Sequence, residues 1–185
     1  MQVCKKCNSE LEENSRSCIN CGEEYNKEEK TNELVGIKGW LILVGFGVLL
    51  SPLKLFYELS EAYLPLLQED TWQQLVFPSS EGYNIDLSLV LLGETIFNLL
   101  MIMASIYLIY LFFTKKTSFP KLYILILVVS ILFIPIDALL VSFIFPEIEA
   151  FDSDTVRELI RSVVAGTIWI PYMLISERVK ATFVN

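Results

Sequence analysis

Histidine is absent from the sequence of 185 residues. Histidine is the commonest general base near neutral pH, and it is the usual ligand of a zinc ion that keeps a catalytic water. The chain also shows no recognisable pairing of a nucleophile with a base. These absences exclude many enzyme mechanisms, and we expect the protein not to be an enzyme.

Charged residues are scarce in most of the chain. They make up 19% of it and are concentrated in the first 38 residues and in short connectors, whereas 54% of all residues are hydrophobic. The mean hydropathy is +0.52, and an ordinary soluble domain has only roughly 45–50% apolar residues. The long uncharged runs predict an integral membrane protein in contact with membrane lipids.

Cysteine is rare, and all four cysteines lie in the first 21 residues. They form two C-x-x-C pairs, Cys4 with Cys7 and Cys18 with Cys21, which ten residues separate. A gap of two residues lets each turn direct both sulfurs to one tetrahedral zinc ion. The pattern predicts a zinc ribbon over residues 1–25 that holds one structural Zn²⁺.

Two further features bear on this predicted ribbon. Asn8 and Gly22 directly follow the two pairs, and these residue types best tolerate the positive φ that such turns need. The segment is too short to bury much apolar surface, so metal binding has to supply folding free energy on the order of 10 kcal/mol. Four thiolates close the coordination and leave no place for an activated water. The alternative is two disulfides, which would require an oxidising compartment.

The surface of the predicted ribbon is mostly acidic. Its acidic residues are Glu10, Glu12, Glu13, Glu23 and Glu24. An acidic surface argues against nucleic-acid binding, so a protein partner is the better expectation. Residues 26–38 are polar and lack a sustained apolar period, which predicts a linker.

Four apolar segments follow the linker. They lie at about residues 40–58, 87–113, 122–145 and 158–175. Each is close to the roughly 20 helical residues that cross a bilayer core of about 30 Å. Residues 39–185 are therefore predicted to form a domain of four transmembrane helices. The expected fold class is an all-α membrane protein with a short N-terminal zinc ribbon.

Lysine and arginine are missing from two of the connectors, residues 59–86 and residues 146–156. In contrast, the connector 114–121 contains three lysines, and basic residues also flank the first span and end the chain. Cytoplasmic connectors are enriched in lysine and arginine. This distribution predicts a multi-pass protein with both termini in the cytoplasm, where reducing conditions favour zinc over disulfides.

Two stretches resemble a bacterial membrane family. Residues 36–45, GIKGWLILVG, and the following Ser51-Pro52-Leu53 resemble the opening of the family called domain of unknown function 2569. Residues 169–183, WIPYMLISERVKATF, resemble its ending. Members with a zinc ribbon ahead of the helices have a similar layout. The resemblance covers roughly residues 34–185 and implies a protein of the bacterial inner (plasma) membrane, with no catalytic activity to carry over.

Five polar side chains fall within the predicted spans, where a charge at mid-helix costs about 2.5–3.5 kcal/mol. They are Lys54, Glu94, Asn98, Asp137 and Arg161. Long basic side chains can extend along apolar surface to water, whereas the two carboxyl groups are too short to do so easily. The acids are therefore paired, functional, or protonated and hydrogen-bonded. We hypothesise that the four charged residues pair in the outer half of the bundle.

These observations lead to two expectations about function. The first is a non-enzymatic membrane scaffold or regulatory protein, whose ribbon binds a cytoplasmic protein and whose helices pack with a membrane partner or with copies of itself. The alternative is a small transporter, channel component or ligand sensor that uses the outer polar cluster. Four spans lack the repeats typical of secondary transporters, so transport would require oligomerisation.

Overall fold

The computed structural model describes residues 2–4, 6–11, 18–22, 35–68, 71–81, 83–147 and 149–185. The chain divides into two compact units, Met1–Gly36 and Ile37–Asn185. In the first unit, strand β1 (Gln2–Val3) pairs with strand β2 (Glu10–Leu11) in an antiparallel sheet, with Gln2 opposite Leu11. The turn between the two strands contains the first cysteine pair.

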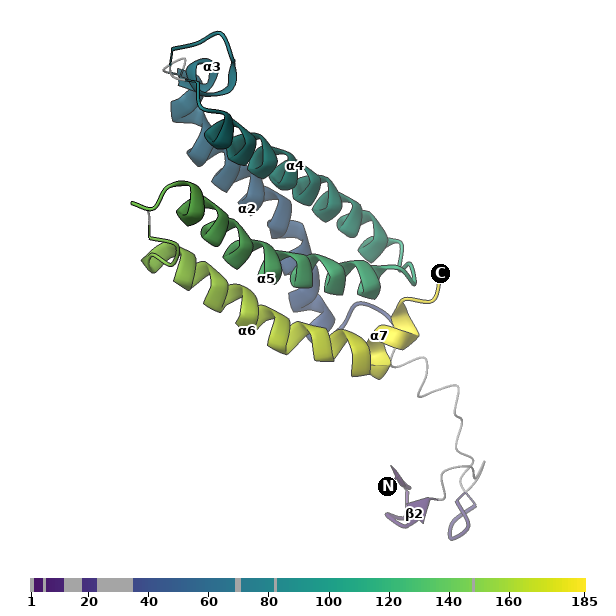
Figure 1. Ribbon diagram of the computed structural model, residues 1–185. Coiled ribbons are helices and arrows are strands. Elements are labelled where there is room, and N and C mark those ends of the chain that lie inside the picture. Colours follow the sequence, from purple (N-terminus) through teal and green to yellow (C-terminus); the bar gives the residue numbers. More distant parts are fainter. Residues whose placement is uncertain are drawn as a thin grey trace. The chain divides into compact units, whose positions relative to one another are not determined.

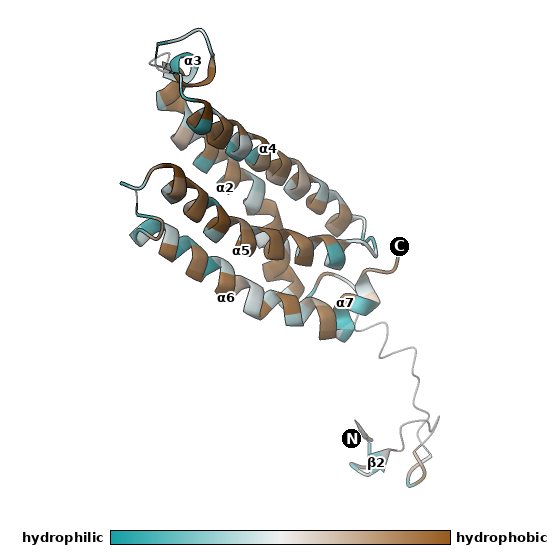
Figure 2. Cartoon of the chain, viewed as in Figure 1, coloured by the Kyte–Doolittle hydropathy of each residue, from teal (hydrophilic) through white to brown (hydrophobic). Residues whose placement is uncertain are grey.

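The second unit is helical. Its described residues form α2 (Trp40–Gln68), α3 (Thr71–Val76), α4 (Ile85–Phe113), α5 (Phe119–Ile144), α6 (Ser153–Ile175) and α7 (Glu177–Thr182). The four long helices pack side by side (Figure 1), and each is long and apolar enough to cross a membrane. Figure 2 shows apolar residues along the length of these helices and polar residues at their ends. The predicted fold class is confirmed.

Many large apolar side chains on the long helices point away from the protein interior. Phe143 of α5, for example, is 85% exposed, and Met103 of α4 is 67% exposed. In water such a surface would be strongly unfavourable, because burial of apolar area is the main favourable term in folding. Lipid tails remove this penalty, so the exposed apolar faces support a multi-pass membrane protein.

Successive long helices run in opposite directions, so the ends of the bundle differ. The start of α2, the α4–α5 connector and α7 lie at one end, which we call the α7 end (Figure 1). Helix α3 and the α5–α6 connector lie at the other end, which we call the α3 end.

Helix α2 is longer than the predicted span 40–58, because it continues to Gln68. Its added part packs on α4, where the hydroxyl oxygens of Tyr63 and Thr95 are 2.8 Å apart. The 29 residues of α2 extend over about 44 Å at a helical rise of 1.5 Å per residue. A bilayer core is only about 30 Å thick, so the helix extends beyond the apolar layer. The hydropathy of the sequence therefore identifies only the part of α2 that lies within lipid, and not the full length of the helix.

Helix α6 begins at Ser153, five residues before the predicted start of the fourth span at 158. The side chain of Asp152 accepts a hydrogen bond of 2.8 Å from the backbone N–H of Thr155. This contact caps the helix by satisfying one of the backbone donors that lack a partner in the first turn. The charged first turns of α6 therefore belong to the helix.

The buried core of the helical unit lies at the α7 end. Its members are Leu41, Val44, Val48, Leu108, Leu111, Phe112, Phe119, Met173, Val179 and Phe183. Aromatic rings dominate its centre, where the centroid of Phe112 is 5.1 Å from that of Phe119 and 5.8 Å from that of Phe183. Gly45 is needed beside this centre, because a Cβ atom there would lie 2.9 Å from the Phe112 ring.

The C-terminal residues are fixed to the connector between α4 and α5. The backbone N–H of Thr117 donates to the carbonyl of Asn185 at 2.8 Å, and the N–H of Asn185 donates to the carbonyl of Lys115 at 3.2 Å. Phe183 stacks on Phe119 with 4.5 Å between the ring centroids. The chain end therefore closes the α7 end of the bundle.

Candidate functional site

The two cysteine pairs form turns with the same local geometry. The backbone N–H of Asn8 donates to the carbonyl of Cys4, and the N–H of Gly22 donates to the carbonyl of Cys18, both at 2.9 Å. Asn8 has a φ of 56° and Gly22 a φ of 69°. These angles lie in the left-handed region that glycine and asparagine tolerate best. The prediction of positive φ at both positions is confirmed.

The four sulfurs converge on one point. Cys4 Sγ is 3.5 Å from Cys21 Sγ, and Cys7 Sγ is 3.5 Å from Cys18 Sγ. All four sulfurs lie within 4.8 Å of one another, and no disulfide joins any two of the four cysteines. Tetrahedral zinc with Zn–S bonds of about 2.3 Å requires sulfurs about 3.8 Å apart. The geometry therefore fits one metal ion, and these four cysteines are the residues that would hold it.

Ser9 is a member of this site that the sequence analysis missed. Its hydroxyl oxygen lies 2.9 Å from Cys7 Sγ and 3.2 Å from Cys18 Sγ. Hydrogen bonding to Ser9 is the main cause that lowers the pKa of both thiols, and with the N–H of Cys21 it lowers the pKa of Cys18 to about 6. A lowered pKa favours the thiolate, which is the form that binds metal. An isolated serine gives no signal of this role in the sequence.

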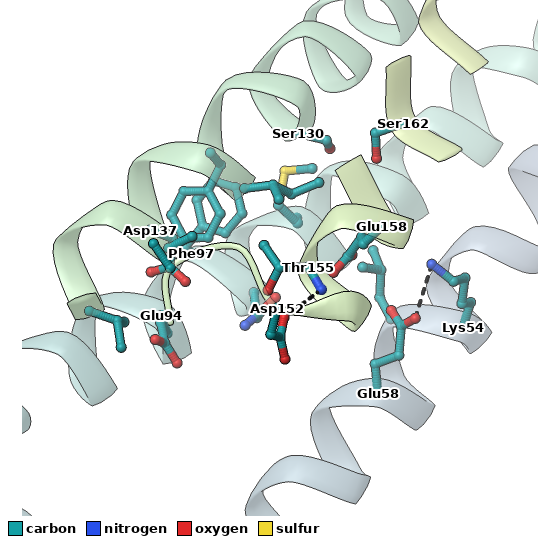
Figure 3. A pocket seen from close by; sticks show the side chains of 18 of the residues that line it. Lys54, Glu58, Glu94, Phe97, Ser130, Asp137, Asp152, Thr155, Glu158 and Ser162 are labelled. Carbon is teal, nitrogen blue, oxygen red and sulfur yellow. Dashed lines mark hydrogen bonds and ion pairs between the residues drawn. The ribbon is translucent and has the colours of Figure 1, made fainter. Parts of the chain in front are cut away.

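A pocket of about 470 Å³ lies between α2, α4, α5 and α6 toward the α3 end. Six acidic residues line it, namely Glu58, Glu94, Asp137, Glu149, Asp152 and Glu158. Figure 3 shows carboxylates from several helices around this space. The buried core cluster lies at the α7 end, so it does not fill this volume.

Four of the five polar residues predicted to form an intramembrane cluster line this one pocket. They are Lys54 of α2, Glu94 and Asn98 of α4, and Asp137 of α5. Arg161 of α6 does not line it and is exposed. Helix α6 presents Glu158 and Ser162 to the pocket instead.

The hypothesised pairing of the four charged residues is wrong. Lys54 Nζ lies 3.0 Å from Glu58 Oε1, one turn along the same helix. Within the described part of the chain, Glu94, Asp137 and Arg161 make no ion pair. Glu58 lies at the predicted end of the first span, but α2 continues through it, so Lys54 and Glu58 are one turn apart on a continuous helix.

One wall of the pocket is apolar. The rings of Phe97 and Phe133 are stacked with centroids 3.5 Å apart and planes at 4°, and Met101 and Val141 also line the space. Asp152 also lines the pocket, and its side chain caps α6. Its hydrogen bonds to Thr155 lower the pKa of its carboxyl group, so this residue remains negatively charged near neutral pH.

Comparison with known proteins agrees with this architecture. The family model described as Protein of unknown function (DUF2569) matches residues 34–184. The chain belongs to the DUF2569 family. The resemblance seen in the two end motifs is thereby confirmed. Searches of curated proteins and of solved structures found no match.

The two candidate sites differ in their relation to the DUF2569 match. The pocket residues all lie within the matched range 34–184. The cysteine cluster lies ahead of that range, in the unit Met1–Gly36. The cysteine cluster therefore lies outside the part of the chain that the family model describes, whereas the pocket belongs to that part.

Proposed function

We propose that this DUF2569 protein is a non-enzymatic scaffold or regulatory protein of the bacterial inner membrane, whose zinc ribbon binds a cytoplasmic protein. The observation that carries the proposal is the convergence of four sulfurs in a unit of its own. A metal held by four thiolates has no open position for a substrate or an activated water. Such a metal stabilises a surface, and a small metal-stabilised surface suits recognition of another protein.

The second cysteine turn presents an apolar side chain for such an interaction. Ile19 lies between Cys18 and Cys21 and is 83% exposed, and the neighbouring Asn20 is also exposed. Both flanking cysteines are metal ligands, so the bound metal would hold this turn in one conformation. A rigid apolar contact loses little conformational entropy on binding. We therefore place Ile19 in the interface with the partner protein.

Crosslinking in the native membrane tests this proposal. We expect the full chain to crosslink to a specific cytoplasmic protein, and Ile19→Ser to lose that product while keeping its metal. Asn20→Ser is the matched control, because it changes the adjacent exposed position. This variant should keep both the crosslinked product and the metal. Metal content is measured on each purified variant. An unchanged crosslink pattern in both Ile19→Ser and Cys18→Ser would show that the ribbon is not the interaction module.

The orientation in the membrane follows from the charges at the two ends of the bundle. The α7 end carries the basic residues Lys38, Lys115, Lys116, Lys121, Arg178 and Lys180. The connectors at the α3 end, 69–84 and 145–152, contain no lysine or arginine. The excess of lysine and arginine on the cytoplasmic side of membrane proteins supports a cytoplasmic α7 end. Both termini then lie in the cytoplasm, on the side of the reducing agents that preserve thiols.

Labelling of single introduced cysteines measures this orientation. We expect a membrane-impermeant maleimide to modify Ser79→Cys and Glu147→Cys in intact cells, and Thr117→Cys only after permeabilisation. All three positions are exposed in the protein, so burial does not prevent labelling. Peptide mapping by mass spectrometry separates the introduced cysteines from the four native ones. The reverse labelling pattern would place the cysteine cluster outside the cell and support the disulfide alternative.

A second candidate function is favoured by the pocket. We propose that the protein also senses a ligand, because four polar residues singled out in the spans line one space of about 470 Å³. The packed aromatic core closes the α7 end of the bundle, so the pocket does not continue through the helical unit. A space closed at one end suits a ligand sensor better than a channel.

A further inference from the structure

We propose that the pocket between α2, α4, α5 and α6 binds an organic cation that has an apolar body. The inference rests on the second candidate function, the sensing of a ligand, and it names the chemical class of that ligand. Three features of the pocket carry it: an excess of negative charge, a size too large for a metal ion, and an aromatic wall.

Negative charge is in excess in the pocket. Lys54 is the sole basic residue in its described lining, and Glu58 already neutralises it at 3.0 Å. Glu94 and Asp137 both line the pocket, and neither has a basic partner within the described residues. Figure 3 shows these two carboxyl groups close together, on α4 and α5. A bound cation would balance this charge, which is costly inside an apolar layer.

The arrangement of the carboxylates does not suit a metal ion. Calcium and magnesium need several oxygens within about 2.0–2.6 Å of one point. Throughout the described part of the chain, the four cysteines are the sole set of ligand atoms that converges in this way. The pocket acids instead surround a volume of about 470 Å³. Pockets of about 300–1,000 Å³ are typical of small organic ligands.

The apolar wall of the pocket provides contacts for the apolar body of the ligand. Phe97 and Phe133 are stacked face to face, and Figure 3 shows the Phe97 ring beside the carboxyl group of Asp137. Phe97 and Phe133 line the same pocket as Asp137, and an aromatic face attracts positive charge. The apolar body of a bound cation would contact Met101 and Val141, which line the same space. A substituted amine or quaternary ammonium combines these properties.

Binding of benzyltrimethylammonium to the full chain tests the proposal. The protein is placed in nanodiscs of zwitterionic lipid, and binding is measured by titration calorimetry. We expect saturable binding that weakens by at least about tenfold in the double variant Glu94→Gln/Asp137→Asn, because two carboxylates at low effective dielectric are lost. Glu61→Gln is the matched control, since Glu61 is an exposed acid of α2 outside the pocket lining, and it should bind like the wild type.

A second variant keeps the charges and tests the aromatic wall. Phe97→Leu should weaken binding of the same probe by about threefold, and thermal unfolding of each variant verifies that it is folded. Equal binding by the wild type and the double variant would overturn the proposal. So would equal binding of neopentylbenzene, the neutral carbon isostere of the probe.

Titration with Ca²⁺ distinguishes failure of the organic-cation proposal from failure of the proposed sensing function. Carboxylate-dependent binding of Ca²⁺ without binding of benzyltrimethylammonium would overturn the organic cation but retain a sensing pocket. If no probe binds, charged or neutral, both the ligand class and the second candidate function are refuted.

Discussion

Replacing Cys18 with serine is expected to remove the bound metal and unfold the ribbon. Purified wild-type protein should contain one zinc per chain, because four sulfurs within 4.8 Å of one another complete one tetrahedral site. In Cys18→Ser only three sulfurs remain, and these cannot complete the four-coordinate site. In zinc peptides the metal contributes roughly 10–16 kcal/mol of apparent binding free energy, which is also the free energy of folding. Elemental analysis measures the metal, and hydrogen exchange of residues 2–11 reports the fold.

Ser9→Ala is expected to weaken metal binding without abolishing it. Its hydroxyl group contacts Cys7 Sγ and Cys18 Sγ, whereas the four sulfurs are the atoms that would coordinate the metal. We expect this variant to keep one zinc with affinity reduced by about tenfold, as is usual when a partner of a metal ligand is removed. Competition with a chromophoric chelator gives the affinity. A different metal in the wild type, or four disulfide-bonded cysteines in freshly lysed cells, would contradict the zinc site.

Phe112→Ala is expected to cause the largest loss of stability in the helical unit. Phe112 is 1% exposed, and its ring contacts both Phe119 and Phe183. Truncation of a buried phenylalanine leaves a cavity and typically costs about 3–5 kcal/mol. The C-terminal residues pack on the same rings, so their attachment to the α4–α5 connector should weaken as well. Thermal unfolding in detergent, with protease sensitivity of the chain end, measures both effects.

The neighbouring residue provides the control for this prediction. Phe113 is 53% exposed and lies on the outer side of α4, so Phe113→Ala should change the unfolding temperature little. The two variants remove the same atoms one position apart on the same helix. Equal losses of stability would mean that α4 is rotated relative to the arrangement described above, and that the aromatic core is not where the structure places it.

Local patterns were sufficient to predict most of the architecture. A helix that crosses lipid needs a long apolar run, and four such runs are visible without knowledge of their packing. The spacing of the cysteines predicts one metal site, because a C-x-x-C turn brings its two sulfurs together over four residues. The same locality explains the positive φ angles at Asn8 and Gly22, since these depend on the residue type at one position in a turn.

Helix ends and ion pairs were harder to predict. The prediction ended the first span at residue 58, because charge signals the edge of lipid, yet α2 continues to Gln68 where Tyr63 packs on α4. The hypothesis drawn from the sequence paired Lys54 with acids on other helices. The nearest acid lies on the same helix, at Glu58. A neighbour one turn away on the same helix can be identified from the sequence alone. A contact between helices also depends on how each helix is rotated about its axis.

By itself, the sequence determined the membrane class, the four long apolar helices and the pairing of the cysteines in two turns, because each depends on residue type and spacing along a short stretch. The tertiary structure alone decided that Ser9 joins the cysteine cluster, that Arg161 lies outside the pocket, and that the core is confined to the α7 end. The place of Ser9 depends on how the two cysteine turns fold together. The pocket lining and the position of the core depend on the separation and rotation of helices far apart in the chain, which packing establishes and no local pattern encodes.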